Sequence, residues 1–331
     1  MQLMADEFLK RGIDTTTATY TSEWYGYKND INLNLELEKN RLKLHYKMIK
    51  FSIFAIASYD IFHFHYGSSL YGNRIIPHID MRILKALGKK VYMHFRGSDL
   101  IDKNYYKKLK NNFDDKSSLY TEDAIRAGTK KRLPIISKYS DKIFVSTPNM
   151  LDLLPRAILI PQVISDNPDR IRKKLLYDGE TIKIVHAPTD KNIKGTKYIV
   201  SIINELIQEG FDISLEIIEN KKPIEVASAF KNCHFGIDQL LSGWYGKVSI
   251  ELMQLGKPVF CYIHDKYFNA FNSEIPIINV NRNTLKTRLK YYLSNTTELQ
   301  IIGEKGVEFV NKFHSQKSVV DKLIPLYENY K

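Results

Sequence analysis

The sequence contains little cysteine and no long apolar run. Its two cysteines, Cys233 and Cys261, have no second Cys or His at metal-ligand spacing, so we expect a reduced, cytosolic protein. The most apolar stretch, residues 51–64, is interrupted by Asp60 and is too short to span a bilayer. The first residues, MQLMADEFLKRG, are charged and lack the apolar core of a signal peptide. Any membrane contact is therefore expected to be peripheral.

Acidic residues are outnumbered by basic ones, 37 to 49, which gives a formal net charge of +12. This balance favours acidic partners, namely nucleotides, phosphates, nucleic acid or an anionic membrane, and does not choose among them. The basic segment 103–142, with KKLK at 107–110 and KKR at 130–132, is expected to be helical. Its plainest interpretation is a solvated face, and contact with an anionic lipid or an acceptor phosphate is the alternative.

Apolar runs typical of strands alternate with amphipathic helical patterns along the chain. Strands are expected at 13–20, 59–65, 89–95, 141–146 and 157–160, and again at 181–186, 213–218, 236–238, 259–263 and 275–280. With 331 residues, of which 44% are hydrophobic, this alternation predicts an α/β fold of two doubly wound, Rossmann-like domains that face a cleft. The polar segment after residue 160 divides them into 1–164 and 165–331.

The glycine-containing stretch 236–260 predicts an anion-binding site in the second domain. It contains a strand ending at Asp238, a loop with Gly243 and Gly246, and a helix that carries Glu251. Glycine lets a ligand approach the backbone, and the start of a helix presents N–H groups without intrahelical partners. Glu251 falls at the margin of the apolar stripe of its helix, although an ordinary surface carboxylate is the alternative interpretation.

A second helix start in the same domain carries Lys194, Gly195 and Thr196. Two helix starts aimed at one crevice suit a diphosphate, and Lys194 would stabilise the charge on a breaking phosphate ester bond. A solvent-exposed lysine beside a turn is the alternative. Glu251 is able to accept two hydrogen bonds from a ribose diol. The patterns GxxxxGK[ST], GxGxxG, GxSxG and HExxH are absent, so the usual markers of kinases, dinucleotide enzymes and hydrolases are missing.

The first domain offers a polar cluster at the end of the strand 89–95. His94, Arg96, Ser98 and Asp99 follow that strand, at the edge where open parallel sheets place ligands, although Asp99 could instead cap the next helix. His63 and His65 share one face of the strand 59–65. As a zinc pair they lack an evident third ligand, so we expect a polar strand end that lines a cleft, and no metal site.

Four segments, YDIFHFHYG, GKKVYMHFRGSD, HAPTDKNIKGT and SGWYGKVSIELMQLGKPV, occur in an order and spacing that resembles bacterial glycosyltransferases of the GT-B fold, family 4. The resemblance covers nearly the whole chain. It implies transfer of a sugar from a UDP- or GDP-sugar, without a metal or cofactor and usually with retention at the anomeric carbon. It also implies that Lys194 contacts the diphosphate, Glu251 the ribose and His94 the donor sugar. The last helix, 316–330, would cross back to the first domain.

The chain departs from the family pattern at two places. Gly243 stands eight residues before Glu251, where the family has a glutamate that binds the donor sugar, so this contact would fall to Asp238, Trp244 or Tyr245. Family members also begin with a strand and a Gly-rich loop that touches the diphosphate, whereas Met1 already lies in the helix expected to follow. Either the reading frame begins too late or the protein lacks a central strand of its first sheet, and the lack of that strand would expose two strand edges.

The leading hypothesis is a glycosyltransferase that acts on a lipid-linked or polysaccharide acceptor at the cytosolic face of a membrane. A catalytically silent, transferase-like glycan-binding or accessory subunit is the first alternative. A nucleotide-sugar epimerase is a further alternative, since it would use similar phosphate-binding sites. A fold alone does not determine the reaction. A nucleic-acid partner is not expected, because aromatic pairs such as Tyr105–Tyr106 and Tyr291–Tyr292 lie in helical patterns that suit packing.

Overall fold

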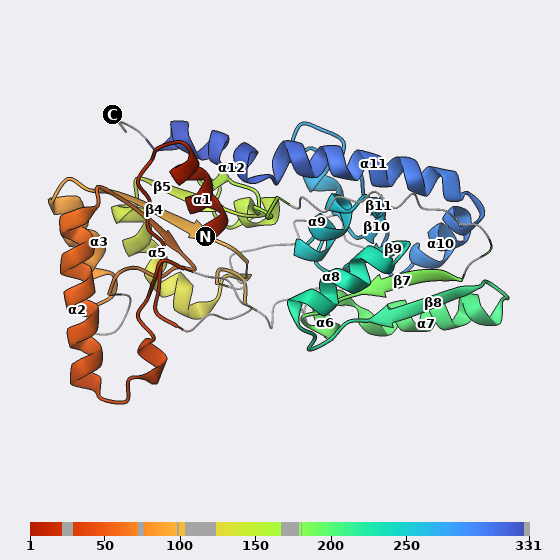
Figure 1. Cartoon of the computed structure of the whole chain (residues 1–331), viewed down its shortest axis with the longest axis horizontal. Coiled ribbons are helices and arrows are strands. Elements are labelled where there is room, and N and C mark those ends of the chain that lie inside the picture. The colour runs from red at the N-terminus through yellow and green to blue at the C-terminus, as the bar shows by residue number, and fades with distance from the viewer. Residues whose placement is uncertain are drawn as a thin grey trace. The chain divides into compact units, whose positions relative to one another are not determined.

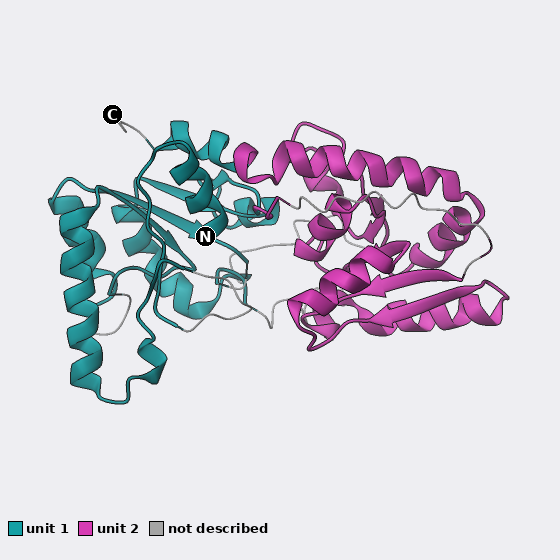
Figure 2. Ribbon diagram, viewed as in Figure 1, with its two compact units in different colours: residues 1–105, 120–162, 319–331 teal, residues 106–119, 163–318 magenta. Residues whose placement is uncertain are grey.

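The computed structural model describes residues 1–21, 29–71, 76–97, 99–102, 124–166, 179 and 181–327 (Figure 1). These residues fall into two compact units (Figure 2). The first contains the described residues within 1–105, 120–162 and 319–331, and the second those within 163–318. The chain passes into the second unit after Gln162, whereas the boundary predicted from the sequence lies after residue 164. It returns to the first unit at Val319.

The first unit is built on a parallel sheet. Its strands are β1 (Ala18–Thr19), β2 (Ile31–Asn32), β3 (Ile61–His65), β4 (Lys90–Phe95), β5 (Lys142–Val145) and β6 (Ile158–Leu159). Its α-helices are α1 (Gln2–Lys10), α2 (Arg41–Ser58), α3 (Ile79–Ala86) and α5 (Ala127–Tyr139), with short 3-10 helices at Leu35–Leu37, Pro148–Asp152 and Ile324–Leu326. The sheet has the order β3-β4-β5-β6, and β1 pairs with β2 in a separate sheet of two parallel strands.

Local contacts explain why two elements of the first unit are shorter than expected. The helix expected over 33–57 begins at Arg41, because the Asn40 side chain accepts hydrogen bonds from the N–H groups of Leu42 (2.9 Å) and Lys43 (3.2 Å). The strand expected over 13–20 is reduced to Ala18–Thr19, since the N–H of Thr17 donates to the carboxylate of Asp30. Of the expected basic helix, α5 covers Ala127–Tyr139, and KKLK at 107–110 lies outside the described residues.

The second unit has a five-stranded parallel sheet in the order β11-β10-β9-β7-β8. Its strands are β7 (Ile182–His186), β8 (Ile213–Ile217), β9 (Phe235–Ile237), β10 (Val259–Cys261) and β11 (Ile278–Asn279). Its helices are α6 (Lys191–Lys194), α7 (Thr196–Gln208), α8 (Pro223–Asn232), α9 (Lys247–Gln254), α10 (Leu285–Ser294) and α11 (Thr296–Phe313), with a 3-10 turn at Asp265–Tyr267, and α12 (Gln316–Leu323) follows. The predicted α/β fold with parallel sheets is thus confirmed.

Two apolar clusters pack the second sheet between layers of helices. One cluster joins α7 and α10 to the sheet, through residues such as Ile203 and Leu289, and the other joins α8, α9 and α11, through residues such as Phe230, Leu252 and Phe309. A parallel sheet buried on both faces needs apolar side chains in both directions, which is why its strands read as apolar runs. Buried polar residues such as His186 and Asp238 lie instead at the carboxyl ends of β7 and β9.

Glycine allows α11 to lie very close to the turn that follows α9. A Cβ atom at Gly303 would be 2.1 Å from the carbonyl oxygen of Gly256, and Gly256 itself has a φ of +71°. The contact is between two backbones, so neither partner is able to move aside as a flexible side chain would.

We expect Gly303→Ala to lower the free energy of unfolding by about 1–3 kcal/mol, because the added methyl group overpacks this contact. The measurement is urea denaturation of the whole chain. Gly128→Ala is the matched control, since a Cβ atom at Gly128 in α5 meets no atom within 4 Å, and this change is expected to be neutral or stabilising. Equal unfolding midpoints for the two variants would contradict the packing argument.

Candidate functional site

In the second unit, a buried histidine joins the ends of two strands to the start of a helix. His186 ends β7, and its Nδ1 lies 2.8 Å from the carbonyl oxygen of Ile237, which ends β9. Because a carbonyl only accepts, Nδ1 carries the proton, and Nε2 accepts from the hydroxyl of Thr196 at 2.8 Å. Burial lowers the pKa of His186, which keeps the ring neutral. No role was predicted for this histidine from the sequence, although its place at a strand end was a usable signal.

The predicted Lys194 and Asp238 form a buried ion pair. Lys194 Nζ lies 2.5 Å from Asp238 Oδ1, and the two residues are 8% and 1% exposed. Burial acts to raise the pKa of Asp238, but the Lys194 ammonium and the hydrogen bonds from Ser249 and Gly246 outweigh it, so this pKa lies below its ordinary value. Lys194 is thus not the solvent-exposed lysine beside a turn that was the alternative interpretation of the sequence.

The turn that carries Lys194 is shaped by its neighbours. The Asp190 carboxylate caps α6, accepting from the N–H groups of Asn192 (2.9 Å) and Ile193 (3.2 Å). Gly195 follows with a φ of +77°, a conformation that glycine adopts without strain, and a Cβ atom there would lie 3.3 Å from Leu240. The loop after β9 therefore packs directly on this turn.

Asp238 also holds the start of α9. Its Oδ2 accepts from the N–H of Gly246 (2.8 Å) and from the hydroxyl of Ser249 (2.7 Å). A Cβ atom at Gly246 would be 3.2 Å from both Asp238 Oδ2 and Lys194 Nζ. From the sequence, we interpreted the glycine at position 246 as room for a ligand near the backbone. The structure shows instead that a side chain there would crowd this ion pair. The two predicted helix starts are nevertheless brought together, with Asp238 as the link.

Glu251 lies on the next turn of α9 and is partly exposed. Its side chain is 31% exposed and pairs with Lys247 of the same helix at 3.1 Å. A single, largely solvated pair of this kind contributes little to stability, so Glu251 remains available to a ligand.

The loop residues Trp244 and Tyr245 are packed into the core of the second unit. They are 4% and 3% exposed, their rings stack at 4.5 Å, and the Tyr245 hydroxyl hydrogen bonds to His314 Nε2 at 2.9 Å. Gly243, with a φ of +71°, turns the chain before them. Both aromatic side chains thus have a structural role that the sequence did not indicate, and their contact with a donor sugar stays a prediction.

In the first unit, the predicted cluster after β4 is a set of buried polar groups. His94 is 1% exposed, its Nε2 bonds to the Ser146 hydroxyl at 3.0 Å, and its Nδ1 has no hydrogen-bond partner among the described residues. The Asp99 carboxylate accepts from the backbone N–H of Arg96 at 2.9 Å, so it closes its own turn and not the start of a helix. Burial raises the pKa of Asp99. Ser98 lies outside the described residues.

Three histidines come together where β3 and β4 end. His65 is in register with His94, and this pairing supplies the third ring that the sequence did not identify beside His63 and His65. The rings of His63 and His65 stack at 4.5 Å and 11°, so their in-plane nitrogen lone pairs do not converge on one ion. Burial, followed by the charge of Arg96, lowers the pKa of His63 to about 3. The cluster is therefore a stack of neutral rings whose nitrogen atoms lie within 4.8 Å of one another but, in this arrangement, are not directed at a single ion.

We expect Asp238→Asn to lower the free energy of unfolding by about 3–5 kcal/mol, because it leaves the Lys194 charge buried without its counter-ion. Adding Lys194→Met should recover part of this loss, since the double variant buries no charge. A double-mutant cycle by chemical denaturation measures the coupling. Additive effects of the two substitutions would contradict a buried, coupled pair.

No family model matches the chain. A stretch of 110 residues, 32% of the chain, is 29% identical to the uncharacterized glycosyltransferase MJ1178 of Methanocaldococcus jannaschii. The match covers 31% of that protein, so the chain spans about a third of the length of this curated relative.

Solved structures match the chain over much more of its length. Sucrose-phosphate synthase from Thermosynechococcus elongatus is 15% identical, with 94% of this chain and 86% of that chain covered and a TM-score of 0.58. Anabaena Alr3699/HepE, solved with UDP and glucose, is 10% identical, with 88% and 83% covered and a TM-score of 0.55. At such low identity the likeness concerns the fold. The chain has the GT-B fold of these structures, as the resemblance in its sequence implied.

Proposed function

We propose that this protein is a glycosyltransferase that moves a sugar from a nucleotide diphosphate donor to a lipid-linked or polysaccharide acceptor, with retention and without a metal ion. The observation that carries the proposal is the buried Lys194–Asp238 pair at the carboxyl ends of β7 and β9, which joins the starts of α7 and α9. Helix starts and a fixed ammonium form a preorganised positive site for phosphate oxygens.

Lys194 would contact the donor diphosphate. An ammonium has three N–H donors, and the hydrogen bond to Asp238 uses one of them. The remaining donors, together with the first N–H groups of α7, would meet the phosphates and offset the charge that develops as the sugar leaves. A positive side chain in this place does the work that a divalent cation does in other phosphate sites, which is why we infer metal-independent transfer.

Glu251 would bind the nucleoside and His94 the donor sugar. A carboxylate on a partly exposed helix face is able to accept both hydroxyls of a ribose. His94 offers a neutral ring whose Nδ1 is not used within the described residues, which suits a hydrogen bond to a sugar hydroxyl. Retention would require the departing phosphate and the acceptor hydroxyl to share one face of the sugar.

A surface of α2 supports peripheral contact with an anionic membrane at its cytosolic face. Four apolar side chains recur at helical spacing and are 48% to 80% exposed: Leu42, Tyr46, Ile49 and Ile53. Exposed basic residues stand beside them: Arg41, Lys43, Lys47 and Lys50. An apolar stripe next to basic side chains is typical of helices that lie on anionic lipid. In the part of the chain that the structure describes, no helix is long and apolar enough to span a bilayer.

A catalytically silent, glycan-binding or accessory protein is the second candidate. The observation that favours it is that Gly243 has no side chain and that Trp244 and Tyr245 are packed in the core, which leaves the donor sugar without an assigned selecting group. Such a protein would bind a nucleotide or glycan without hydrolysing or transferring the donor sugar.

Glu251→Gln is expected to weaken nucleotide binding at least tenfold, because the amide loses the second strong acceptor for the ribose diol. Calorimetry with UDP and GDP measures this, with UDP first because the similar HepE structure contains it. Glu225→Gln is the control, since Glu225, on α8, likewise pairs with the lysine four residues before it, Lys221. Failure of both nucleotides to bind, or equal affinities for the two variants, would contradict the site. Donor hydrolysis in the same samples separates the two candidate functions.

Ile49→Glu with Ile53→Glu is expected to reduce binding to anionic vesicles at least tenfold, because two charges replace buried apolar contacts with lipid. Cosedimentation with phosphatidylglycerol vesicles measures the effect, and phosphatidylcholine vesicles test the role of charge. Ile224→Glu with Ile301→Glu is the matched control, since both isoleucines are exposed in the second unit. The α2 surface is the wrong one if the control pair reduces binding equally.

A further inference from the structure

Arg96, which follows β4 in the first unit, is a cation that no carboxylate pairs with. Its Nε donates to Nδ1 of His65 at 3.3 Å. Within the part of the chain that the structure describes, the two terminal nitrogen atoms of the guanidinium have no hydrogen bond or ion pair. Both oxygens of the Asp99 carboxylate accept instead from the backbone N–H of Arg96, at 2.9 Å. Most of the N–H groups of this guanidinium are therefore left for a ligand.

The side chain of Arg96 is only partly exposed, so its charge has lost part of its hydration. Burial lowers the pKa of Arg96 below its ordinary value, against the opposing effects of Tyr66 and Asp99. An arginine nevertheless keeps its charge in proteins. Because an ion that leaves water is unfavourable without a counter-charge, this position favours a bound anion.

The residue that orients Arg96 is a neutral ring and not an acid. His65 is 8% exposed, and burial lowers its pKa well below the ordinary value, so the ring is uncharged. Its Nδ1 accepts from Arg96, so Nε2 carries the proton. Such an acceptor fixes the direction of the guanidinium without offsetting its charge. Arg96 differs in this respect from Lys194, whose charge is offset by the Asp238 carboxylate at 2.5 Å.

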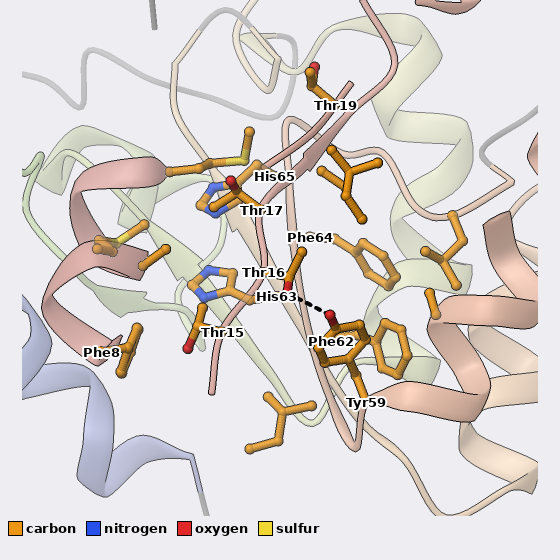
Figure 3. A pocket seen from close by; sticks show the side chains of 18 of the residues that line it. Phe8, Thr15, Thr16, Thr17, Thr19, Tyr59, Phe62, His63, Phe64 and His65 are labelled. Atoms are coloured by element: carbon orange, nitrogen blue, oxygen red, sulfur yellow. Dashed lines mark hydrogen bonds between the residues drawn. The ribbon is translucent and has the colours of Figure 1, made fainter. Parts of the chain in front are cut away.

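Unused polar atoms of two more histidines belong to the same cluster. His63 Nε2 and His94 Nδ1 are buried and have no hydrogen-bond partner among the described residues. The rings of His63 and His65 lie on the same side of β3 (Figure 3), and His65 is in register with His94. Arg96 follows His94 by two residues and contacts His65, so it lies on this face as well. An unpaired cation and unpaired ring nitrogens thus meet near the carboxyl ends of β3 and β4, where open parallel sheets bind ligands.

We propose that Arg96 binds a phosphate ester of the acceptor, so that the acceptor belongs to the lipid-linked, phosphate-bearing class and not to the neutral polysaccharides. This assignment rests on the proposed sugar transfer. There the donor diphosphate is bound by Lys194 in the second unit, so the anion at Arg96 is a separate one. A neutral polysaccharide offers only hydroxyl groups, which would leave this charge without a counter-ion.

The shape of the guanidinium also suits a phosphate. Its planar fork binds two oxygens of one phosphate through parallel hydrogen bonds. A carboxylate would fill the fork equally well, but it has no further oxygen. A phosphate has a third oxygen, which an unused ring nitrogen of the same cluster would meet when that nitrogen carries the proton. The arrangement therefore favours a phosphate ester over a carboxylate.

Arg96→Gln should lower the affinity for glucose 1-phosphate at least tenfold, because the variant loses the charge and the fork. Calorimetry with saturating UDP measures this, since UDP then occupies the phosphate site of the second unit. Arg156→Gln is the matched control, because it removes an exposed positive charge from the same unit. Arg96→Lys should keep part of the affinity, since the charge remains without the fork. Methyl glucoside and glucuronate should each bind the unchanged protein at least tenfold more weakly than glucose 1-phosphate.

His65→Glu places beside Arg96 the carboxylate that it lacks. We expect this variant to bind glucose 1-phosphate at least tenfold more weakly, because an internal ion pair would compete with the ligand. His65→Gln is its control, since an amide oxygen accepts from the guanidinium without a charge, and its affinity should change less than threefold. Urea denaturation checks that both variants fold. A purely structural role of His65 would make the two variants weaken binding alike.

Modification of arginine by phenylglyoxal tests the site in the unchanged protein and without UDP. Glucose 1-phosphate should slow the modification of Arg96 at least fivefold, as measured by peptide mass spectrometry, and should leave that of Arg156 unchanged. Equal rates at Arg96 with and without the ligand would overturn the proposal. So would equal affinities of the Arg96→Gln and Arg156→Gln variants, or equal binding of glucose 1-phosphate, glucuronate and methyl glucoside.

The same variants separate the acceptor from the donor as the source of the phosphate. Arg96→Gln should bind UDP as the unchanged protein does, and a tenfold loss of UDP affinity would overturn the assignment to the acceptor. Failure of UDP to bind any variant would contradict sugar transfer instead. Protection of Arg96 from phenylglyoxal is measured apart from UDP, so the two failures are distinguishable.

Discussion

The buried pair of Lys194 and Asp238 is the interaction on which the second unit depends. A charge that is removed from water without a partner costs several kcal/mol, so each residue requires the other in this place. Their contact fixes the turn after α6 against the loop after β9, and the second carboxylate oxygen holds the start of α9 through Gly246 and Ser249. One carboxylate thus determines how two helix starts lie at the same edge of the sheet.

A buried ion pair is weak evidence for stability, because well-packed apolar residues would often stabilise the same fold better. The place of this pair at the carboxyl edge of a parallel sheet, beside two helix starts, therefore favours an electrostatic role. In the proposed function, Asp238 would orient the ammonium before a ligand arrives, so that no reorganisation is needed when negative charge develops. His186 would contribute in the same way, as a neutral ring that holds Thr196 at the start of α7.

The sequence predicted the elements of this site but not their contacts. Apolar runs and glycines indicated where the strands end and the helices begin, because these signals are local. The pairing of Lys194 with Asp238, 44 residues apart, depends on β7 lying beside β9, which local patterns do not specify. Trp244 and Tyr245 had the polar, glycine-rich neighbours of a ligand loop, and only the packing of α11 and His314 shows that they are buried. The third histidine likewise follows from strand register.

The polar cluster of the first unit depends on the backbone of β3. The rings of His63 and His65 stack with each other, and they lie against the ring of His94 at centroid distances of 5.4 and 5.3 Å. Because rings in van der Waals contact do not move separately, a shift of β3 would also move the ring of His94. The orientation of this histidine is therefore coupled to the backbone of β3 by direct contact.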